Sequence, residues 1–165
     1  HRGKYECTDR GCMWLSDTPT KPSRSWGNKV PRIAIWVLLT DIYTGKKFYV
    51  FNTHFDHKSD EHRERRAELL DLVTHDLETF ADDIFVMGDF NCSYDSQALS
   101  PLNATFQNNV VPDIPTFTGF EFTKSKIIDM IFSKRTKHKS QVFERGHYGH
   151  NISDHNALMI YEDNK

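Results

Sequence analysis

The chain has 165 residues, with 21 Lys and Arg against 23 Asp and Glu, and 13% of its residues are aromatic. That length predicts a single domain, residues 1–165, large enough to bury a core. The aromatic content argues against disorder. A net charge of -2 excludes a polybasic protein that coats nucleic acid through bulk charge, so any phosphate-binding site must be local.

The three cysteines are too few for a disulfide scaffold, and their odd number leaves at least one thiol free. Cys7 and Cys12 lack the second pair of ligands that a zinc finger needs, so we interpret them as ordinary cysteines. No run approaches the roughly 20 apolar residues of a membrane helix, and residues 1–4 contain no apolar signal core. The sequence leaves the cellular compartment open.

The N-terminal third predicts strands. Residues 1–30 are polar and turn-rich except for residues 12–15, which indicate a short strand followed by an irregular loop. Residues 32–39 form a long β-branched and aromatic run, typical of a mostly buried strand. A turn at 41–47 leads to a second strand at 48–52, and this spacing favours a hairpin.

The rest of the chain predicts one long helix and further strands. Ser59 can cap a helix that runs to about residue 80, because apolar residues recur there every three or four positions. A short apolar run at 84–87, ending at Gly88, indicates a buried strand. The remaining expected elements are helical turns at 96–102, a loop-rich segment at 103–125, strands at 127–132 and 157–161, and a weaker strand at 141–143. The pattern predicts a mixed α/β fold with sheets in its interior.

Polar clusters stand at the ends of the apolar strands. They are Asn-Thr-His-Phe-Asp-His at 52–57, Gly-Asp-Phe-Asn at 88–91, Asp129 within 126–131, and Ser-Asp-His-Asn at 153–156. A carboxylate within a strand, such as Asp129, is costly to bury unless a cation or a metal lies beside it. A histidine at another strand end is the natural partner, because a carboxylate fixes the tautomer of an imidazole.

These clusters contain the parts of a metal-assisted hydrolase. Asp89 and Asn91 are two residues apart, so on an extended strand both side chains would share one face. Asp154 adds a hard oxygen ligand beside His155, and oxygen ligands without Cys suit Mg²⁺ or Mn²⁺ better than zinc. A base, an orienting amide, a metal ligand and a His-Asp pair are what metal-assisted phosphoester hydrolysis requires.

The same clusters, in this order, resemble the endonuclease/exonuclease/phosphatase superfamily with the deoxyribonuclease I-like fold. Gly-Asp-Phe-Asn after an apolar strand and Ser-Asp-His near the C-terminus are its most specific signatures, and Asn-Thr-His and Ile-Asp-Met-Ile-Phe support them. The resemblance extends to Trp14, Ser25-Trp26 and Pro31-Arg32-Ile33, and so spans nearly the whole chain. It implies an α/β (α+β) fold, a two-sheet sandwich.

The resemblance also implies roles for individual residues. Asp89 is similar to the aspartate that orients or deprotonates the attacking water and helps to hold the metal, and Asn91 to the amide that holds the scissile phosphate. His155, with Asp129 as its carboxylate partner, is similar to the histidine that stabilises charge on the phosphate. Asp154 is similar to the metal-ligating aspartate before that histidine, and His54 to a second active-site histidine.

Three further residues are weaker candidates for contact with the substrate phosphate. Arg63, early in the predicted helix, resembles an arginine of bacterial-type members, and His57 and Arg32 are candidates of the same kind. The other histidines have no motif support and are expected at the surface; they are His62, His75, His138, His147 and His150.

The sequence departs from the family pattern at its beginning. Members normally start with a strand carrying an Asn and a segment carrying a metal-ligating Glu in a Gln-Glu pair. Glu6 does not match that motif, so we expect the chain to begin partway through the family's domain. A second chain could cover the sheet edges and apolar surface that absent strands would expose.

We therefore predict a Mg²⁺- or Mn²⁺-dependent phosphoester hydrolase, a nuclease or a phosphatase. Its substrate is a nucleic acid or a small phosphorylated molecule such as a sugar phosphate, an inositol phosphate or a lipid headgroup. One alternative is a non-catalytic fragment that acts as an interaction module, because the metal-binding Glu is missing. Another is a zinc hydrolase that uses His54, Asp56 and His57.

Overall fold

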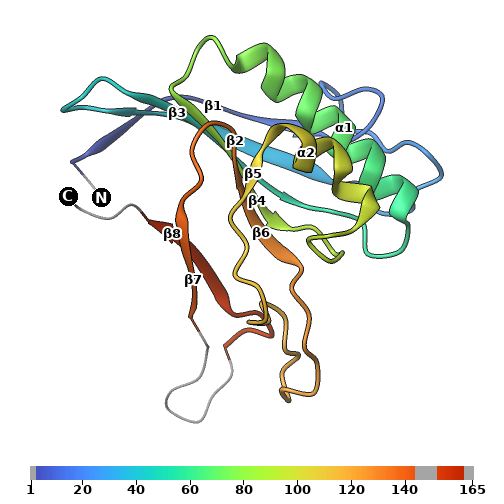
Figure 1. Ribbon diagram of the computed structural model, residues 1–165. Coiled ribbons are helices and arrows are strands. Elements are labelled where there is room, and N and C mark those ends of the chain that lie inside the picture. Colours follow the sequence, from blue (N-terminus) through green and yellow to red (C-terminus); the bar gives the residue numbers. More distant parts are fainter. Residues whose placement is uncertain (1–2, 144–151, 162–165) are drawn as a thin grey trace.

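The computed structural model describes residues 3–143 and 152–161 (Figure 1). Its elements are β1 (Tyr5–Trp14), β2 (Ile33–Asp41), β3 (Lys47–His54), α1 (Asp60–Leu77), β4 (Asp83–Asp89), the 3₁₀ turn η1 (Gln97–Leu99), α2 (Ser100–Thr105), β5 (Gln107–Asn108), β6 (Asp129–Ser133), β7 (Lys139–Phe143) and β8 (Ala157–Tyr161). His147 and His150 lie outside the described residues.

Six strands form one sheet in the order β1-β2-β3-β4-β6-β5, and β7 pairs with β8 in a second sheet. β3 and β4 are parallel, whereas their outer neighbours β2 and β6 pair with them antiparallel. A parallel pair needs a long crossover, and α1 supplies it. The carboxyl ends of β3 and β4 therefore meet at one edge, where β6 begins.

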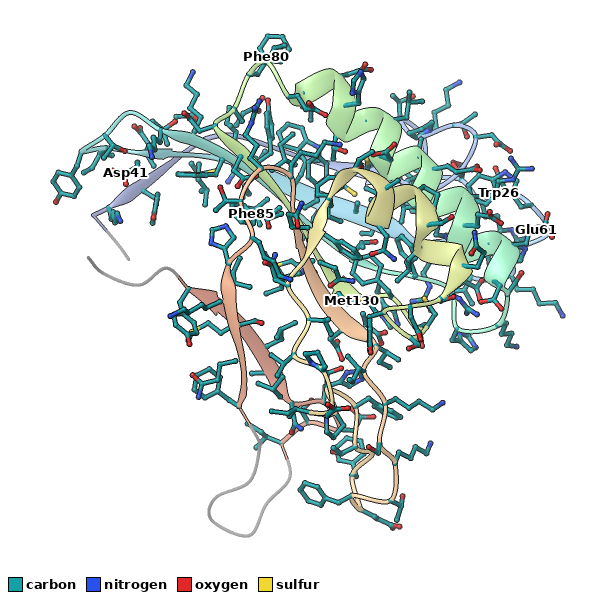
Figure 2. All side chains as sticks on the ribbon, in the orientation of Figure 1. Trp26, Asp41, Glu61, Phe80, Phe85 and Met130 are labelled. Carbon is teal, nitrogen blue, oxygen red and sulfur yellow. The ribbon has the colours of Figure 1, made fainter. Side chains whose placement is uncertain are left out.

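Helices cover one face of the six-stranded sheet, and the two-stranded sheet lies on the other side (Figure 1). Side chains fill the layer between α1 and the sheet (Figure 2). This core joins the helix residues Ala67 and Leu70 to Phe51, Val86 and Phe132 of three strands. Ser59 caps α1 by accepting a hydrogen bond from the backbone N–H of His62, which satisfies one of the free donors at a helix start.

The opposite face of the sheet is only partly covered. Ile33 and Ile35 of β2 are 38% and 50% exposed there. A hollow on this face is lined by Ile33 and Ile35 and by the strand-end residues His54, Asp89 and Asp129.

The mixed α/β fold with two sheets is confirmed, as are the hairpin of β2 with β3 and the long capped helix. The first strand is longer than predicted, because β1 begins at Tyr5 and pairs with β2 as far as Trp14. It is an edge strand whose residues are mostly exposed, so it lacks the apolar pattern that marks a buried strand.

Among the described residues, no helix combines the length and the apolar character that crossing a membrane requires.

Candidate active site

The strand register brings three distant segments together. His54 at the end of β3 is the Cα partner of Asp89 at the end of β4, and Asp89 is in turn the partner of Asp129 at the start of β6. The Nε2 atom of His54 lies 3.4 Å from Oδ2 of Asp89. The Nε2 atom of His155, which precedes β8, lies 3.9 Å from the same oxygen.

His155 is held in one orientation by its neighbours. Its Nδ1 lies 2.7 Å from Oδ2 of Asp129, and its backbone N–H donates to the Ser153 hydroxyl. The ring of Phe117 packs against the imidazole with centroids 4.9 Å apart. Because a carboxylate only accepts hydrogen bonds, Nδ1 carries a proton, and Nε2 faces Asp89.

Burial and charge shift the pKa values of two residues of this cluster, Asp129 and His54. Burial raises the pKa of Asp129 above its ordinary value, although hydrogen bonds from His155 and Thr116 oppose that change. Burial, helped by the positive charge of Arg32, lowers the pKa of His54, while Asp89 opposes it. The neutral imidazole of His54 is therefore favoured, which leaves it able to accept a proton or a hydrogen bond.

Three of the side chains could hold a metal ion. Asp89, Asp129 and His155 each offer one donor atom, and these three atoms all lie within 4.8 Å of one another. The two carboxylates supply the oxygen ligands that Mg²⁺ and Mn²⁺ take, whereas an imidazole ligand is more typical of zinc. The sequence led us to expect Asp89 and Asp154 as the metal ligands. Asp154 is not part of this group of three. The backbone carbonyl of Asp154 accepts a hydrogen bond from the backbone N–H of Thr118.

Asn91 does not share an extended strand with Asp89, so that local expectation is wrong. β4 ends at Asp89, and Asn91 has a positive φ of 53°. Its backbone N–H donates to Oδ1 of Asp89, and its side-chain amide donates to the carbonyl of Phe55. Such a turn is common for Asn and Asp, and it keeps Asn91 beside Asp89 by a different route.

The structure does not bring the two weaker candidates on and before α1 into the cluster. His57 is exposed in the loop before α1. Arg63 is 8% exposed, and its guanidinium donates to Oδ1 of Asp60 and to the carbonyl of Asp56. It therefore fastens the loop after β3 to the first turn of the helix.

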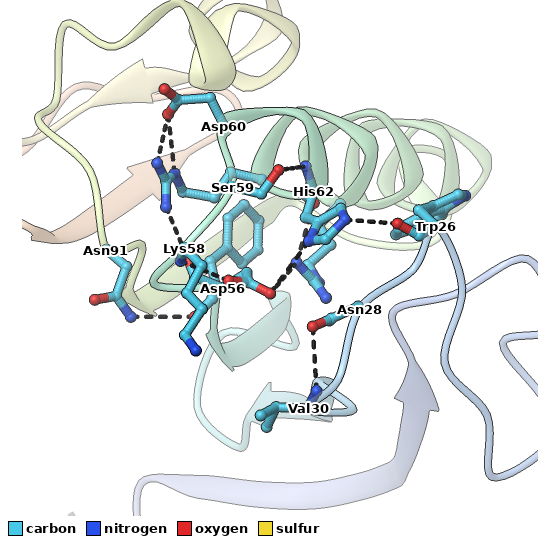
Figure 3. Close-up of polar contacts among 12 residues, drawn as sticks. Trp26, Asn28, Val30, Asp56, Lys58, Ser59, Asp60, His62 and Asn91 are labelled. Carbon is cyan, nitrogen blue, oxygen red and sulfur yellow. Dashed lines mark hydrogen bonds and ion pairs between the residues drawn. The ribbon is translucent and has the colours of Figure 1, made fainter.

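Asp56 belongs to a separate polar network under α1, shown in Figure 3. Its Oδ1 accepts from the backbone N–H of Lys58, and its Oδ2 lies 3.3 Å from Nδ1 of His62. The Nε2 atom of His62 lies 2.6 Å from the carbonyl of Trp26. Arg66, 1% exposed, adds a longer ion pair to Asp56 at 3.9 Å.

The expectation that His62 and His138 lie at the surface is wrong, since both are partly buried, whereas His75 is exposed as expected. His62 lies in the first turn of α1, close to the N-cap Ser59. Its partners are Asp56, six positions away in the sequence, and Trp26, 36 positions away. Only the near partner, Asp56, could have been suggested by the sequence. Because the Asp56 carboxylate is engaged here, the structure gives no support to a zinc site made of His54, Asp56 and His57.

A hollow of about 500 Å³ is lined by His54, Asp89 and Asp129 together with Arg32 and residues of β2 and β3. A smaller one, of about 180 Å³, is lined by Asp129 and Gly88. A separate hollow of about 480 Å³ is lined by Asn91 and the loop after it, with Tyr94 and Lys126 among its walls.

This fold, with its carboxylates and imidazoles at converging strand ends, is that of the deoxyribonuclease I-like proteins. The model of the Endonuclease/Exonuclease/phosphatase family matches residues 5–155, and the chain belongs to that family. Phosphatases and nucleases both belong to it, so the chain is a member of a family of phosphoester hydrolases.

Solved structures from bacteria share the fold. A functionally unknown protein of Enterococcus faecalis V583 is 28% identical with a TM-score of 0.88, and the match covers 98% of this chain and 68% of that one. A mannosyl-6-phosphatase of Bacteroides thetaiotaomicron is 25% identical with a TM-score of 0.80, and that match covers 96% of this chain and 67% of the other.

Among curated proteins, an uncharacterized protein of Acanthamoeba polyphaga mimivirus is 37% identical over 82 residues, which are 47% of this chain and 30% of the viral protein. The chain thus spans about two thirds of the solved relatives and matches less than a third of the curated one. Neither the fold nor these likenesses support a second chain that completes the domain.

Proposed function

We propose that the protein is a metal-dependent phosphoester hydrolase whose active site is the cluster of His54, Asp89, Asp129 and His155. The observation that carries the proposal is the convergence on Asp89 Oδ2 of two imidazole nitrogens, at 3.4 Å and 3.9 Å. A carboxylate that faces two nitrogens and borders an open hollow can accept a proton from a water molecule beside a bound phosphate.

Each residue has a separate task in this proposal. Asp89 orients the attacking water and takes its proton. The amide of Asn91 uses one N–H on the Phe55 carbonyl. Its second N–H, which has no partner among the described residues, would hold a phosphate oxygen. His155, aligned by Asp129, acts with a proton on each ring nitrogen, so that its Nε2–H donates to the charge that develops on the phosphate. His54 faces the same oxygen of Asp89.

The donor set fits a divalent ion, as the geometry of Asp89, Asp129 and His155 indicates. Asp89 would hold the ion together with Asp129, and Asp154 remains the additional ligand proposed from the sequence. A Mg²⁺ or Mn²⁺ ion bound there would neutralise charge on the phosphoryl oxygens.

The test is hydrolysis of small phosphoesters and of single- and double-stranded DNA and RNA, with Mg²⁺, with Mn²⁺ and with EDTA. We expect metal-dependent release of phosphate or cleavage of a phosphodiester, and none in EDTA. Absence of turnover on every substrate, with the protein folded and the metal present, would favour the alternative of a non-catalytic module.

A further inference from the structure

Three arginines lie near the end of β3, and two of them already have anionic partners. Arg63 pairs with Asp60 at the start of α1. Arg66 is buried, pairs with Asp56, and donates to the carbonyl of His62. Neither guanidinium lines the hollow beside the active site.

Arg32 is different. It directly precedes β2, and its backbone carbonyl is fixed by a hydrogen bond from the N–H of Leu15 at 2.8 Å. Arg32 lines the hollow together with His54, Asp89 and Asp129. Within residues 3–143 and 152–161, its Nε is buried without a hydrogen-bond partner, and no ion pair of its guanidinium is recorded there.

Together with burial, the positive charge of Arg32 lowers the pKa values of two neighbouring side chains, His54 and Arg66. It helps to lower the pKa of His54, after the larger effect of burial. It also adds to the effects that lower the pKa of Arg66, of which burial is again the largest. A partly buried guanidinium that repels its neighbours is unfavourable by itself, and an anion placed against it would remove that cost.

We propose that Arg32 binds the phosphate of the substrate, and that it makes the site prefer phosphomonoesters to phosphodiesters. This rests on the function proposed above. A guanidinium fork takes two phosphate oxygens in parallel, which leaves a third oxygen for the Nε2–H of His155 and for a metal ion bound at the site. A monoester offers three terminal oxygens and two charges, whereas a diester offers two oxygens and one charge.

The family resemblance suggested both Arg63 and Arg32 for phosphate contact. The guanidinium of Arg63 is occupied by Asp60 and by the carbonyl of Asp56. Arg32 lines the hollow, and within the described residues its Nε has no hydrogen-bond partner.

The experiment compares Arg32→Gln with the unchanged protein on p-nitrophenyl phosphate and on bis(p-nitrophenyl) phosphate, in Mg²⁺. We expect kcat/KM for the monoester to fall about 10- to 100-fold, the range for hydrogen bonds to a charged group, with less than about a 3-fold change for the diester. Arg32→Lys, which keeps the charge without the fork, should restore part of the loss. Arg65→Gln is the control, because Arg65 is exposed on α1 and pairs only with Glu68 in the described structure.

Equal losses on both substrates, or an unchanged monoester rate, would overturn the role of Arg32 while leaving the hydrolase proposal intact. If the unchanged protein hydrolyses neither ester, phosphate binding decides the role of Arg32, and the wider substrate panel described above decides the hydrolase proposal. Calorimetry in EDTA with inorganic phosphate should give a Kd about 10-fold weaker for Arg32→Gln, and dimethyl phosphate should bind the unchanged protein more weakly than phosphate does. Equal Kd values for phosphate would overturn the inference.

A labelling experiment covers the case in which Arg32→Gln does not fold. Phenylglyoxal modifies accessible arginines, and peptide mapping reads the rate at Arg32 and at Arg65 in the unchanged protein. We expect inorganic phosphate to slow the modification of Arg32 and to leave Arg65 unaffected. Equal rates at Arg32 with and without phosphate would contradict the proposal.

Discussion

At the scale of single residues, each side chain of the cluster takes its chemistry from a neighbour. His155 has a proton fixed on Nδ1 because Asp129 lies 2.7 Å away. Asp89 lies close to two imidazole nitrogens, one from His54 at the end of β3 and one from His155 in the segment before β8. The composition of the chain says nothing of these pairings, since they depend on which strand ends meet.

Removing one carboxylate tests the assignment of the base. In an active protein, Asp89→Asn should lower kcat by roughly 10²- to 10⁴-fold, the range for a positioned proton acceptor. Thermal stability should change little, because an amide oxygen can still accept from the N–H of Asn91. The control is Asp95→Asn, an exposed carboxylate in the loop that follows. Equal kinetics for the two variants would show that Asp89 is not the base.

Asp56 should make stability depend on pH on the acid side. Burial would raise its pKa, but hydrogen bonds from Lys58 and His62 and the charge of Arg66 outweigh burial and lower it below the ordinary 3.8. The unfolded chain then binds the proton first, so this stability is present above pH 3.8 and is lost as the pH falls through the folded pKa.

Urea unfolding between pH 2 and 6 measures this dependence. The difference in unfolding free energy between the unchanged protein and Asp56→Asn should be largest near pH 6 and should shrink toward pH 2. A difference that stays constant over this interval would exclude Asp56 as the titrating group.

At the scale of elements, the β3–α1–β4 crossover builds the site. It makes β3 and β4 parallel, so that His54 and Asp89 end side by side. The sequence predicted all three elements, because their apolar patterns and the Ser59 cap are local. It did not predict the turn at Asn91, whose conformation depends on contacts with Asp89 and with the distant Phe55.

Gly88 is required for that parallel pair. Its φ is +140°, and a Cβ added there would lie 1.9 Å from the carbonyl oxygen of Thr53 on β3. Gly88→Ala should therefore destabilise the protein by at least about 3 kcal/mol in urea or thermal unfolding. Gly45→Ala is the matched control, because Gly45 also has a positive φ but open space around it, and it should cost only about 1 kcal/mol. Similar costs for the two variants would argue against the close approach.

His62 should hold the segment around Trp26 against α1. Both ring nitrogens face acceptors, the Asp56 carboxylate and the Trp26 carbonyl, and satisfying both requires two N–H groups. His62→Ala should speed proteolysis or hydrogen exchange at residues 24–30, since their tie to the helix is lost. The control is His75→Ala, at an exposed histidine of the same helix, which should leave hydrogen exchange at residues 24–30 unchanged. An equal response of both variants would show that His62 does not hold this segment.

At the scale of the whole molecule, the site lies where two sheets approach each other. β4 and β6 belong to the large sheet, whereas His155 comes from the segment that leads into the small one. That segment is fixed by hydrogen bonds from Asn156 to the backbone of Thr116 and Pro115. The packing of the two sheets, rather than any single element, therefore completes the His–Asp pair.

Metal binding should stabilise the folded state, because the donors converge only there. At Mg²⁺ or Mn²⁺ concentrations near 100 times Kd, the gain is about 2.7 kcal/mol, or a rise in Tm of roughly 5 to 10 °C for a chain of this size. EDTA should reverse the rise, and Asp89→Asn should abolish it. A rise with zinc alone that His57→Ala removes would instead favour the zinc alternative.

The sequence by itself determined the family, the mixed α/β class and the main strands and helix, because apolar periodicity, capping and the four strand-end motifs are local patterns. The tertiary structure decided that Arg32 and His54 line the hollow, whereas Arg63 and His62 do not. Arg63 and His62 carry the residue types of a site, yet α1 directs them into the network around Asp56, while Arg32 reaches the hollow from the start of β2. Those outcomes follow from sheet register and helix packing, which join residues far apart in the chain and leave no mark in the neighbouring sequence.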